Sequence, residues 1–155
     1  STSRGLGDVY KRQALYHPIN SEINPLSLIE YLDAKNKTIC LPMVVNEKQP
    51  LIFKPWRPGK KMVIGHYGIS VPDNDRTLIP DLIICPLLAY DSKGMRLGYG
   101  GGFYDRTIKY FRKNKRVKYI GLAFSGQKSY HDLPSEVHDV PLDAVLTETG
   151  VDYFQ

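Results

Sequence analysis

The stretch RLGYGGGFYD, residues 96 to 105, combines an arginine, four glycines, an aromatic pair and an aspartate within a short segment. Glycines let the main chain approach an anion closely, because they lack a Cβ atom and tolerate positive φ angles. Arg96 can add a permanently charged, bidentate contact, and Asp105 offers a hard oxygen ligand that suits Mg²⁺. These residue types favour a phosphate site with a magnesium ion, and a tight structural turn is the alternative.

The glycine pattern differs from two well-known phosphate-binding fingerprints. A dinucleotide-binding G-x-G-x-x-G motif would require glycine at Phe103 or at Asp105, depending on where it started. A P-loop would require a closing Gly-Lys-Ser/Thr, which this stretch does not contain. The pattern therefore leaves an anion site of another kind, or a structural turn.

The flanking segments predict the elements that position these glycines. The run DLIICPLLAYD, residues 81 to 91, is apolar on both faces, as expected of a central strand in a sheet covered on both sides. The segment 103–114 predicts a helix whose apolar face carries Phe103, Thr107, Tyr110 and Phe111. Open α/β sheets bind ligands between the carboxyl end of a central strand and the following helix, so the glycines occupy a favourable place.

The rest of the chain completes an α/β pattern. A helix is predicted where Leu26, Ile29 and Leu32 recur at helical spacing, and the segment HYGISVPDND is interpreted as a loop. Further strands are predicted at residues 14–16, 38–45, 50–55, 118–124 and 143–149. This alternation predicts a three-layer α/β/α fold with a mostly parallel central sheet and Rossmann-like topology. Residues 1–13 are interpreted as a non-native or disordered leader, and residues 14–155 as a single domain.

Composition narrows the class of protein. The chain has 155 residues, of which 42% are hydrophobic and 24% charged, which is typical of a globular domain. No run approaches the roughly 18 apolar residues that a membrane span needs, so we expect no membrane association. Cys40 and Cys85 both lie in apolar runs, which indicates buried thiols in a reducing compartment rather than a disulfide. We therefore expect a cytoplasmic protein, and a monomer.

The net charge of +5 is concentrated in residues 106–118, which contain seven Lys or Arg and no acidic residue. A solvated helix face explains such a run most simply, and attraction of a polyanionic small molecule is the second interpretation. Nucleic-acid binding is disfavoured because the neighbouring aromatic residues do not form a stacking array.

The stretch PLLAYDSKGMRLGYGGGFYDRTI, residues 86 to 108, closely resembles the signature of the 5-formyltetrahydrofolate cyclo-ligase family. The similarity extends over roughly residues 14 to 150. It implies an enzyme that uses MgATP to convert 5-formyltetrahydrofolate into 5,10-methenyltetrahydrofolate, with release of ADP and phosphate. In that reaction the formyl oxygen attacks the γ-phosphate, N10 closes the ring and phosphate leaves. A catalytically weak or inactive relative that binds nucleotide or folate is the alternative.

The resemblance also implies roles for individual residues. The implied catalytic residues are Arg96, Tyr104 and Asp105. The ATP-binding residues are Arg96, Leu97, Gly98, Tyr99, Gly100, Gly101, Gly102, Phe103 and Tyr104. The ligands of Mg²⁺ are Asp105 and Asp143, and the folate-binding residues are His17, Glu22, Trp56 and Tyr67.

Several of these residues have simpler interpretations when the resemblance is set aside. Asp143 reads as an ordinary residue at the start of a strand, and Glu22 as a solvated glutamate near a helix start. His17 reads as a structural histidine. Trp56 and Tyr67 suit either a pterin-stacking wall or plain packing.

The sequence departs from the family pattern at its amino-terminal end. Family members begin with a helix carrying Lys and Arg in a K-x-x-x-R-like arrangement that reaches the ATP phosphates. This sequence lacks that helix, and YKRQ does not reproduce its spacing, so no role is carried over to Lys11 or Arg12. Because such catalysis is largely electrostatic, we expect weaker ATP binding and slower transfer.

Overall fold

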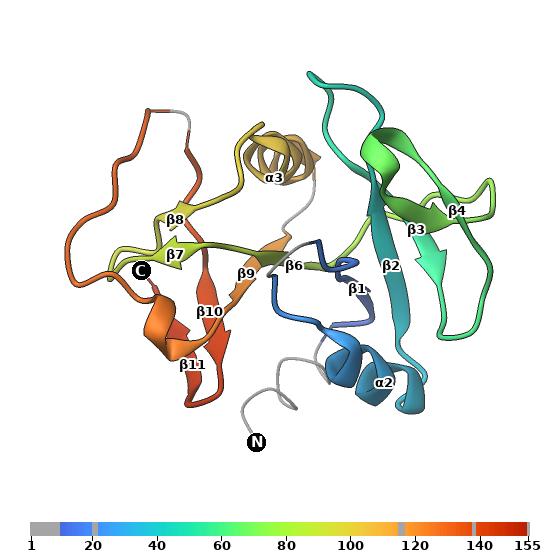
Figure 1. Ribbon diagram of the computed structural model, residues 1–155, viewed down its shortest axis with the longest axis horizontal. Coiled ribbons are helices and arrows are strands. Elements are labelled where there is room, and N and C mark those ends of the chain that lie inside the picture. Colours follow the sequence, from blue (N-terminus) through green and yellow to red (C-terminus); the bar gives the residue numbers. More distant parts are fainter. Residues whose placement is uncertain (1–9, 20–21, 115–116, 138, 155) are drawn as a thin grey trace.

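The computed structural model describes residues 10–19, 22–114, 117–137 and 139–154. Seven strands form one sheet in the order β11-β10-β9-β6-β1-β2-β3 (Figure 1). Their bounds are β1 Arg12–Ala14, β2 Thr38–Met43, β3 Ile52–Trp56, β6 Leu82–Pro86, β9 Lys118–Leu122, β10 Ala144–Thr147 and β11 Gly150–Tyr153. The inner pairs run parallel, and the edge strands β3 and β11 pair antiparallel. The prediction of a mostly parallel central sheet is confirmed.

Helices cover both faces of this sheet, α2 (Leu26–Ala34) on one and α3 (Phe103–Asn114) on the other (Figure 1). Successive side chains of a strand point to opposite faces, and β6, buried along its whole length, contributes to both cores. Ile84 belongs to the core that includes Ile29 and Leu32 of α2, whereas Ile83 belongs to the core that includes Ile108 of α3. The predicted three-layer α/β/α fold is therefore confirmed.

The parallel strands follow a doubly wound order. Taken from β2 across to β10, they run β2-β1-β6-β9-β10, so the chain adds strands first to one side of β1 and then to the other. The order reverses between β1 and β6, and doubly wound sheets bind ligands outside the carboxyl ends of the strands at such a switch point.

Helix α3 spans the predicted residues, but its buried face differs at one position. Thr107 and Ile108 are completely buried, whereas Tyr110 is 53% exposed. Thr107, Ile108 and Phe111 follow the helical repeat, and Tyr110 lies outside that stripe. The prediction that Tyr110 faces the core was wrong.

Strand β1 begins at Arg12, two residues before its predicted start. Gln13 is only 1% exposed, and its backbone pairs with both β2 and β6. The part of the predicted leader formed by Arg12 and Gln13 is therefore sheet, and residues 1–9 lie outside the described residues.

Two short antiparallel pairs flank the main sheet. Strands β4 (Met62–Ile64) and β5 (Ser70–Pro72) form a hairpin beyond β3 (Figure 1), joined through a 3₁₀ turn at His66–Gly68. The segment interpreted as a loop thus contains β5, a strand of only three residues and too short for a clear alternation. Strands β7 (Ala89–Tyr90) and β8 (Arg96–Leu97) form the second pair. Among the described helices, none is long and apolar enough to cross a membrane.

Candidate active site

Two pockets meet at the first turn of α3. The first, here called the polar pocket, has a volume of about 620 Å³ and includes the predicted residues Arg96, Leu97, Gly98, Gly100, Gly101, Gly102 and Asp105. The second, called the aromatic pocket, has a volume of about 150 Å³ and includes the predicted folate-binding residues His17, Glu22 and Tyr67. It also includes Phe103 and Tyr104, for which the resemblance implied ATP binding and which do not line the polar pocket. The polar pocket does not include Tyr99, whose side chain is 46% exposed.

The glycine loop, residues 98–102, brings bare backbone to the start of α3. Gly100, Gly101 and Gly102 have φ angles of 97°, 80° and 66°, a region that favours glycine. The loop leads directly into the amino terminus of a twelve-residue helix, where amide groups and the helix dipole favour an anion. This geometry supports an anion site rather than a turn alone.

Arg106 anchors the glycine loop from inside the helix. Its Nη1 donates to the carbonyl of Gly101 at 2.5 Å, and its Nη2 donates to the carbonyl of Glu47 at 2.8 Å. Its guanidinium also lies over the ring of Phe103, 4.8 Å from the ring centroid. Arg106 therefore ties the loop to the turn after β2, a role that the interpretation of its segment as a solvated cationic face did not include.

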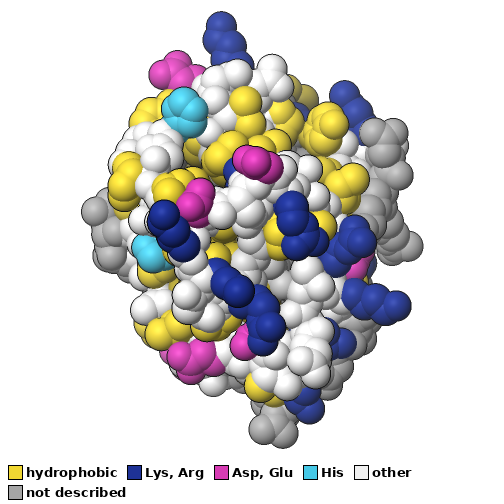
Figure 2. All heavy atoms as spheres, turned by 90° about the vertical axis from the view of Figure 1, so that its right-hand side faces the viewer, with side chains coloured by type: hydrophobic (Ala, Val, Ile, Leu, Met, Phe, Trp, Pro, Cys, Tyr) yellow, Lys and Arg dark blue, Asp and Glu magenta, His cyan; other side chains and the backbone are white. Residues whose placement is uncertain are grey.

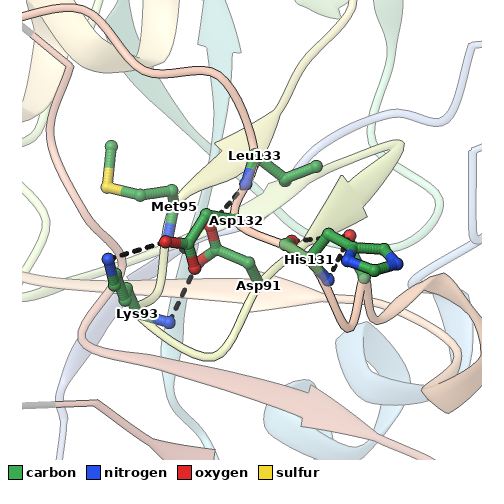
Figure 3. A network of polar contacts seen from close by, with 7 residues as sticks. Asp91, Lys93, Met95, His131, Asp132 and Leu133 are labelled. Carbon is green, nitrogen blue, oxygen red and sulfur yellow. Dashed lines mark hydrogen bonds and ion pairs between the residues drawn. The ribbon is translucent and has the colours of Figure 1, made fainter.

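A buried aspartate shapes the turn that precedes β8 (Figure 3). Asp91 is 1% exposed, and its Oδ1 accepts hydrogen bonds from the amides of Lys93 and Met95 at 2.9 and 3.0 Å. Its Oδ2 accepts from the amide of Leu133 at 2.9 Å, and the Lys93 ammonium pairs with Asp132 at 2.8 Å. The chain after Leu133 forms part of the wall of the polar pocket, so Asp91 holds two parts of that pocket together.

Arg96 lies beneath the glycine loop. Its Nε donates to the hydroxyl of Tyr119 at 2.6 Å and its Nη1 to the carbonyl of Pro86 at 3.3 Å. Burial acts to lower the pKa of Arg96, but nearby Cys85, Tyr119 and Asp105 outweigh it and leave that pKa above its ordinary value. Arg96 is therefore charged at the edge of the polar pocket.

The aromatic pocket gathers residues from distant segments. Glu22 follows β1, Tyr67 lies in the turn of the β4–β5 hairpin, and Phe103 begins α3. The rings of Tyr67 and Phe103 meet edge to face with centroids 6.4 Å apart. Burial raises the pKa of Tyr104 well above its ordinary value, so its phenol stays neutral. Such walls suit a flat, ring-containing ligand.

Glu22 supplies an acidic group of the aromatic pocket. Its Oε1 accepts a hydrogen bond from the amide of Ile19 at 2.8 Å, which fixes the side chain. Burial raises the pKa of Glu22, and the bond to Ile19 and the charge of Arg96 oppose that shift. An anchored carboxylate among aromatic rings can bind a heterocycle that presents hydrogen-bond donors along one edge.

Trp56 lies apart from the aromatic pocket. It pairs with Ile39 near the start of β2, and its Nε1 donates to the carbonyl of Lys60 at 3.1 Å. It lines a separate groove together with Lys37, Arg57, Lys60, Lys61 and Arg76. Figure 2, which looks onto the side carrying β3 and β4, shows Lys and Arg side chains spread over this face. The structure does not bring Trp56 together with the other predicted folate-binding residues.

Asp143 is also apart from its predicted partner. Its Oδ2 accepts from the amide of Tyr119 at 2.8 Å and pairs with Nη2 of Arg112 at 2.6 Å. Arg112 lies in the last turn of α3, whereas Asp105 lies in the first. Asp143, just before the amino end of β10, therefore contacts the end of α3 that is opposite to Asp105. The structure does not place the two carboxylates in one magnesium site.

Asp105 nevertheless fits a metal that is shared with phosphates. Within the described residues no three His, Cys, Asp or Glu side chains are grouped to hold a metal ion. Nucleotide sites commonly hold Mg²⁺ with one or two carboxylates and complete its shell with phosphate oxygens and water. Asp105 lines the polar pocket and can supply one such carboxylate.

The fold and the two pockets define a doubly wound α/β protein that can hold a phosphate-bearing ligand next to a flat heterocycle. The model of the 5-formyltetrahydrofolate cyclo-ligase family matches residues 10–148. The chain belongs to the 5-formyltetrahydrofolate cyclo-ligase family.

Individual relatives agree with this assignment. A 5-formyltetrahydrofolate cyclo-ligase of Haemophilus influenzae is 37% identical over 155 residues, covering 94% of this chain and 82% of the relative. The Escherichia coli K12 protein of the same name is 35% identical over 144 residues, covering 89% and 78%. The solved structure of Aquifex aeolicus 5,10-methenyltetrahydrofolate synthetase superposes with a TM-score of 0.76 at 28% identity, covering 99% of this chain and 79% of that one.

Sequence reasoning missed residues that the fold brings to these pockets. Tyr16 and His66 line the aromatic pocket, and Glu136 and Asp139 line the polar pocket. Tyr16 follows the short strand β1, and the switch point between β1 and β6 would have indicated its position. His66 begins the 3₁₀ turn of the β4–β5 hairpin, and Glu136 and Asp139 lie in a loop, and the sequence patterns of these segments give no such signal.

Proposed function

We propose that this chain is an ATP-dependent cyclo-ligase that converts 5-formyltetrahydrofolate into 5,10-methenyltetrahydrofolate, with release of ADP and phosphate. The observation that carries the proposal is the junction at the start of α3. Gly102 lines the polar pocket, and the next residue, Phe103, lines the aromatic pocket. A nucleotide in one pocket and a folate in the other would therefore meet at adjacent residues.

The polar pocket would hold the ATP phosphates. Amides of the glycine loop and the guanidinium of Arg96 supply donors and positive charge, which offset the charge that develops during phosphoryl transfer. Attack of the formyl oxygen on the γ-phosphate forms an activated imidate phosphate and releases ADP. N10 of the folate then attacks the activated carbon, and phosphate leaves as the ring closes. The chain contributes mainly by positioning the two substrates.

Asp105 would hold the Mg²⁺ that accompanies ATP. When bound, that ion neutralises phosphate charge and orients the transferred group. The feature that supports this role is the position of the Asp105 carboxylate in the first turn of α3, beside the glycine loop.

The aromatic pocket would hold the pterin ring of the folate. Glu22 would accept hydrogen bonds from the donor edge of the ring, and Tyr67, Phe103 and Tyr104 would contact its faces. His17 lies on the exposed margin of the same pocket, where it would contact the substrate away from the buried walls. The two buried free thiols, Cys40 and Cys85, support a reducing, cytoplasmic setting, and we propose a monomer as the working species.

The direct test is turnover by the full chain. We would incubate it with MgATP and 5-formyltetrahydrofolate and follow methenyl absorbance together with ADP and phosphate. The proposal predicts all three products in equal amounts and none when ATP is omitted. Absence of methenyl product despite binding of both substrates would overturn it in favour of a non-catalytic relative.

A further inference from the structure

We propose that Tyr119 is a positioning residue for Arg96, and that it fixes the guanidinium so that its free end faces the polar pocket. Tyr119 lies on β9 and is completely buried. Its hydroxyl accepts the Nε hydrogen of Arg96 at 2.6 Å, from a side chain that lies 23 positions earlier in the chain. This inference rests on the proposed function, because it assigns Arg96 to the nucleotide phosphates.

The contacts of Arg96 divide its guanidinium into a held side and a free side. Tyr119 and the carbonyl of Pro86 engage Nε and Nη1. Within the described ranges, Nη2 donates to no protein atom, and Arg96 lines the polar pocket. An arginine can bind phosphate through several donors at once, but only when the plane of its guanidinium has the correct orientation. The bond to Tyr119 restricts that plane.

Two neighbours leave the guanidinium little room to turn. The ring of Tyr104 lies on one side, with its centroid 5.5 Å from Cζ of Arg96. On another side is Gly98, where an added Cβ atom would lie 2.6 Å from Nη1 of Arg96. Gly98 is therefore needed for the position of Arg96 as well as for the approach of an anion.

Tyr119 is itself fixed by Asp143, the carboxylate for which the resemblance implies a magnesium role. The amide of Tyr119 donates to Oδ2 of Asp143 at 2.8 Å, and the carbonyl of Tyr119 accepts from the amide of Asp143 at 2.8 Å. Arg112 holds the same carboxylate oxygen at 2.6 Å. A continuous set of polar contacts thus runs from the last turn of α3 through Asp143 and Tyr119 to Arg96. This gives Asp143 a positioning role away from the metal.

The test is the Tyr119→Phe variant, which removes the acceptor and keeps the ring. Calorimetric titration of the full chain with MgATP should show an affinity about tenfold weaker than wild type, because a hydrogen bond to a charged group is lost. Affinity for 5-formyltetrahydrofolate should not change. Tyr90→Phe removes another buried phenol hydroxyl outside both pockets and should leave both affinities at the wild-type value.

A double-mutant cycle separates positioning from general loosening of the fold. If Tyr119 acts through Arg96, Tyr119→Phe should have almost no further effect on nucleotide affinity in an Arg96→Gln background. Additive losses, or equal losses of nucleotide and folate affinity, would overturn the inference. Should Tyr119→Phe fail to fold, Gly98→Ala tests the placement of Arg96 directly, because its Cβ would lie 2.6 Å from Nη1 of Arg96. Its loss of nucleotide affinity should vanish in the Arg96→Gln background, and a loss that persists there would overturn the inference that the placement of Arg96 matters.

The binding readout also separates this inference from the proposed function. A wild-type chain that binds MgATP and folate without forming product would defeat the proposed activity, and the cycle of affinities would still decide the role of Tyr119. A wild-type chain that binds no nucleotide would overturn the positioning role itself.

Discussion

The polar and aromatic pockets differ in how the chain builds them. The core of the polar pocket comes from one short stretch, residues 96–105, which contributes the backbone of the glycine loop, Arg96 and Asp105. The aromatic pocket draws side chains from the segment after β1, the end of β2, the β4–β5 hairpin, β6 and the start of α3. A phosphate can be bound by local backbone, whereas a flat heterocycle needs walls on several sides. The start of α3 is common to both pockets.

The largest expected effect tests the polar pocket through Arg96, its half-buried arginine. Arg96→Gln should lower kcat/KM by about 10² to 10³, because it removes a preorganised charge from the site of phosphoryl transfer. Lys109→Gln makes the same change of charge at an exposed position of the same pocket and should cost only a few-fold. Steady-state kinetics, with thermal melts to confirm folding, measure both. Equal losses would show that general attraction of anions, not the placement of Arg96, matters.

The next comparison is between Asp105, in the first turn of α3, and Asp143, which pairs with Arg112 in the last turn of that helix. Asp105→Asn should raise the Mg²⁺ concentration needed for half-maximal rate by roughly tenfold, since on the proposed function Asp105 would supply a metal ligand. Asp143→Asn should leave that concentration unchanged but lower the melting temperature, because it weakens contacts to Arg112 and the amide of Tyr119. A Mg²⁺ requirement that moves with Asp143 alone would reverse the assignment of the two residues.

Glu22 tests the aromatic pocket and predicts a pH dependence. On the proposed function the ionised carboxylate of Glu22 would accept hydrogen bonds from the folate, so folate affinity should be full above the pKa of Glu22 and fall as the pH drops through it. Burial raises that pKa, so the fall should begin at a higher pH than for an ordinary glutamate. Glu22→Gln should raise the folate KM by about tenfold, with no change for ATP. It should also remove this pH dependence, and a variant that retains it would point to another group.

The smallest expected effect distinguishes Tyr67 from Trp56, two aromatic residues for which the sequence predicted the same role in folate binding. Tyr67→Leu should raise the folate KM by about threefold, because one aromatic contact in the pocket is lost. Trp56→Leu should leave the folate KM unchanged and reduce thermal stability, since Trp56 packs on the core beneath α2. A larger folate effect at Trp56 than at Tyr67 would place the pterin elsewhere.

The difference between a pocket built from one stretch and a pocket built from distant segments also explains what could be predicted from the sequence. Strand β6, the glycine loop and α3 follow one another within residues 82–114, and their apolar runs and glycines predicted both the fold and a candidate anion site. The aromatic pocket depends on the short β4–β5 hairpin, whose pattern is too brief to read, so Trp56 and Tyr67 looked equivalent. Tyr119 reads only as a buried strand residue, because its contact with Arg96 arises when β9 pairs with β6. The contacts of Asp143 with Arg112 and the amide of Tyr119 are likewise set by tertiary packing, so the sequence alone gave no sign of them.

The most direct test of the division into two pockets is amide chemical-shift mapping by NMR of the full chain, with each ligand added alone. The account predicts that a non-hydrolysable MgATP analogue shifts the amides of residues 98–102, and that 5-formyltetrahydrofolate shifts those of Ile19, Glu22 and residues 66–70. Shifts of the same amides by both ligands, or an unresponsive glycine loop with nucleotide bound, would contradict it.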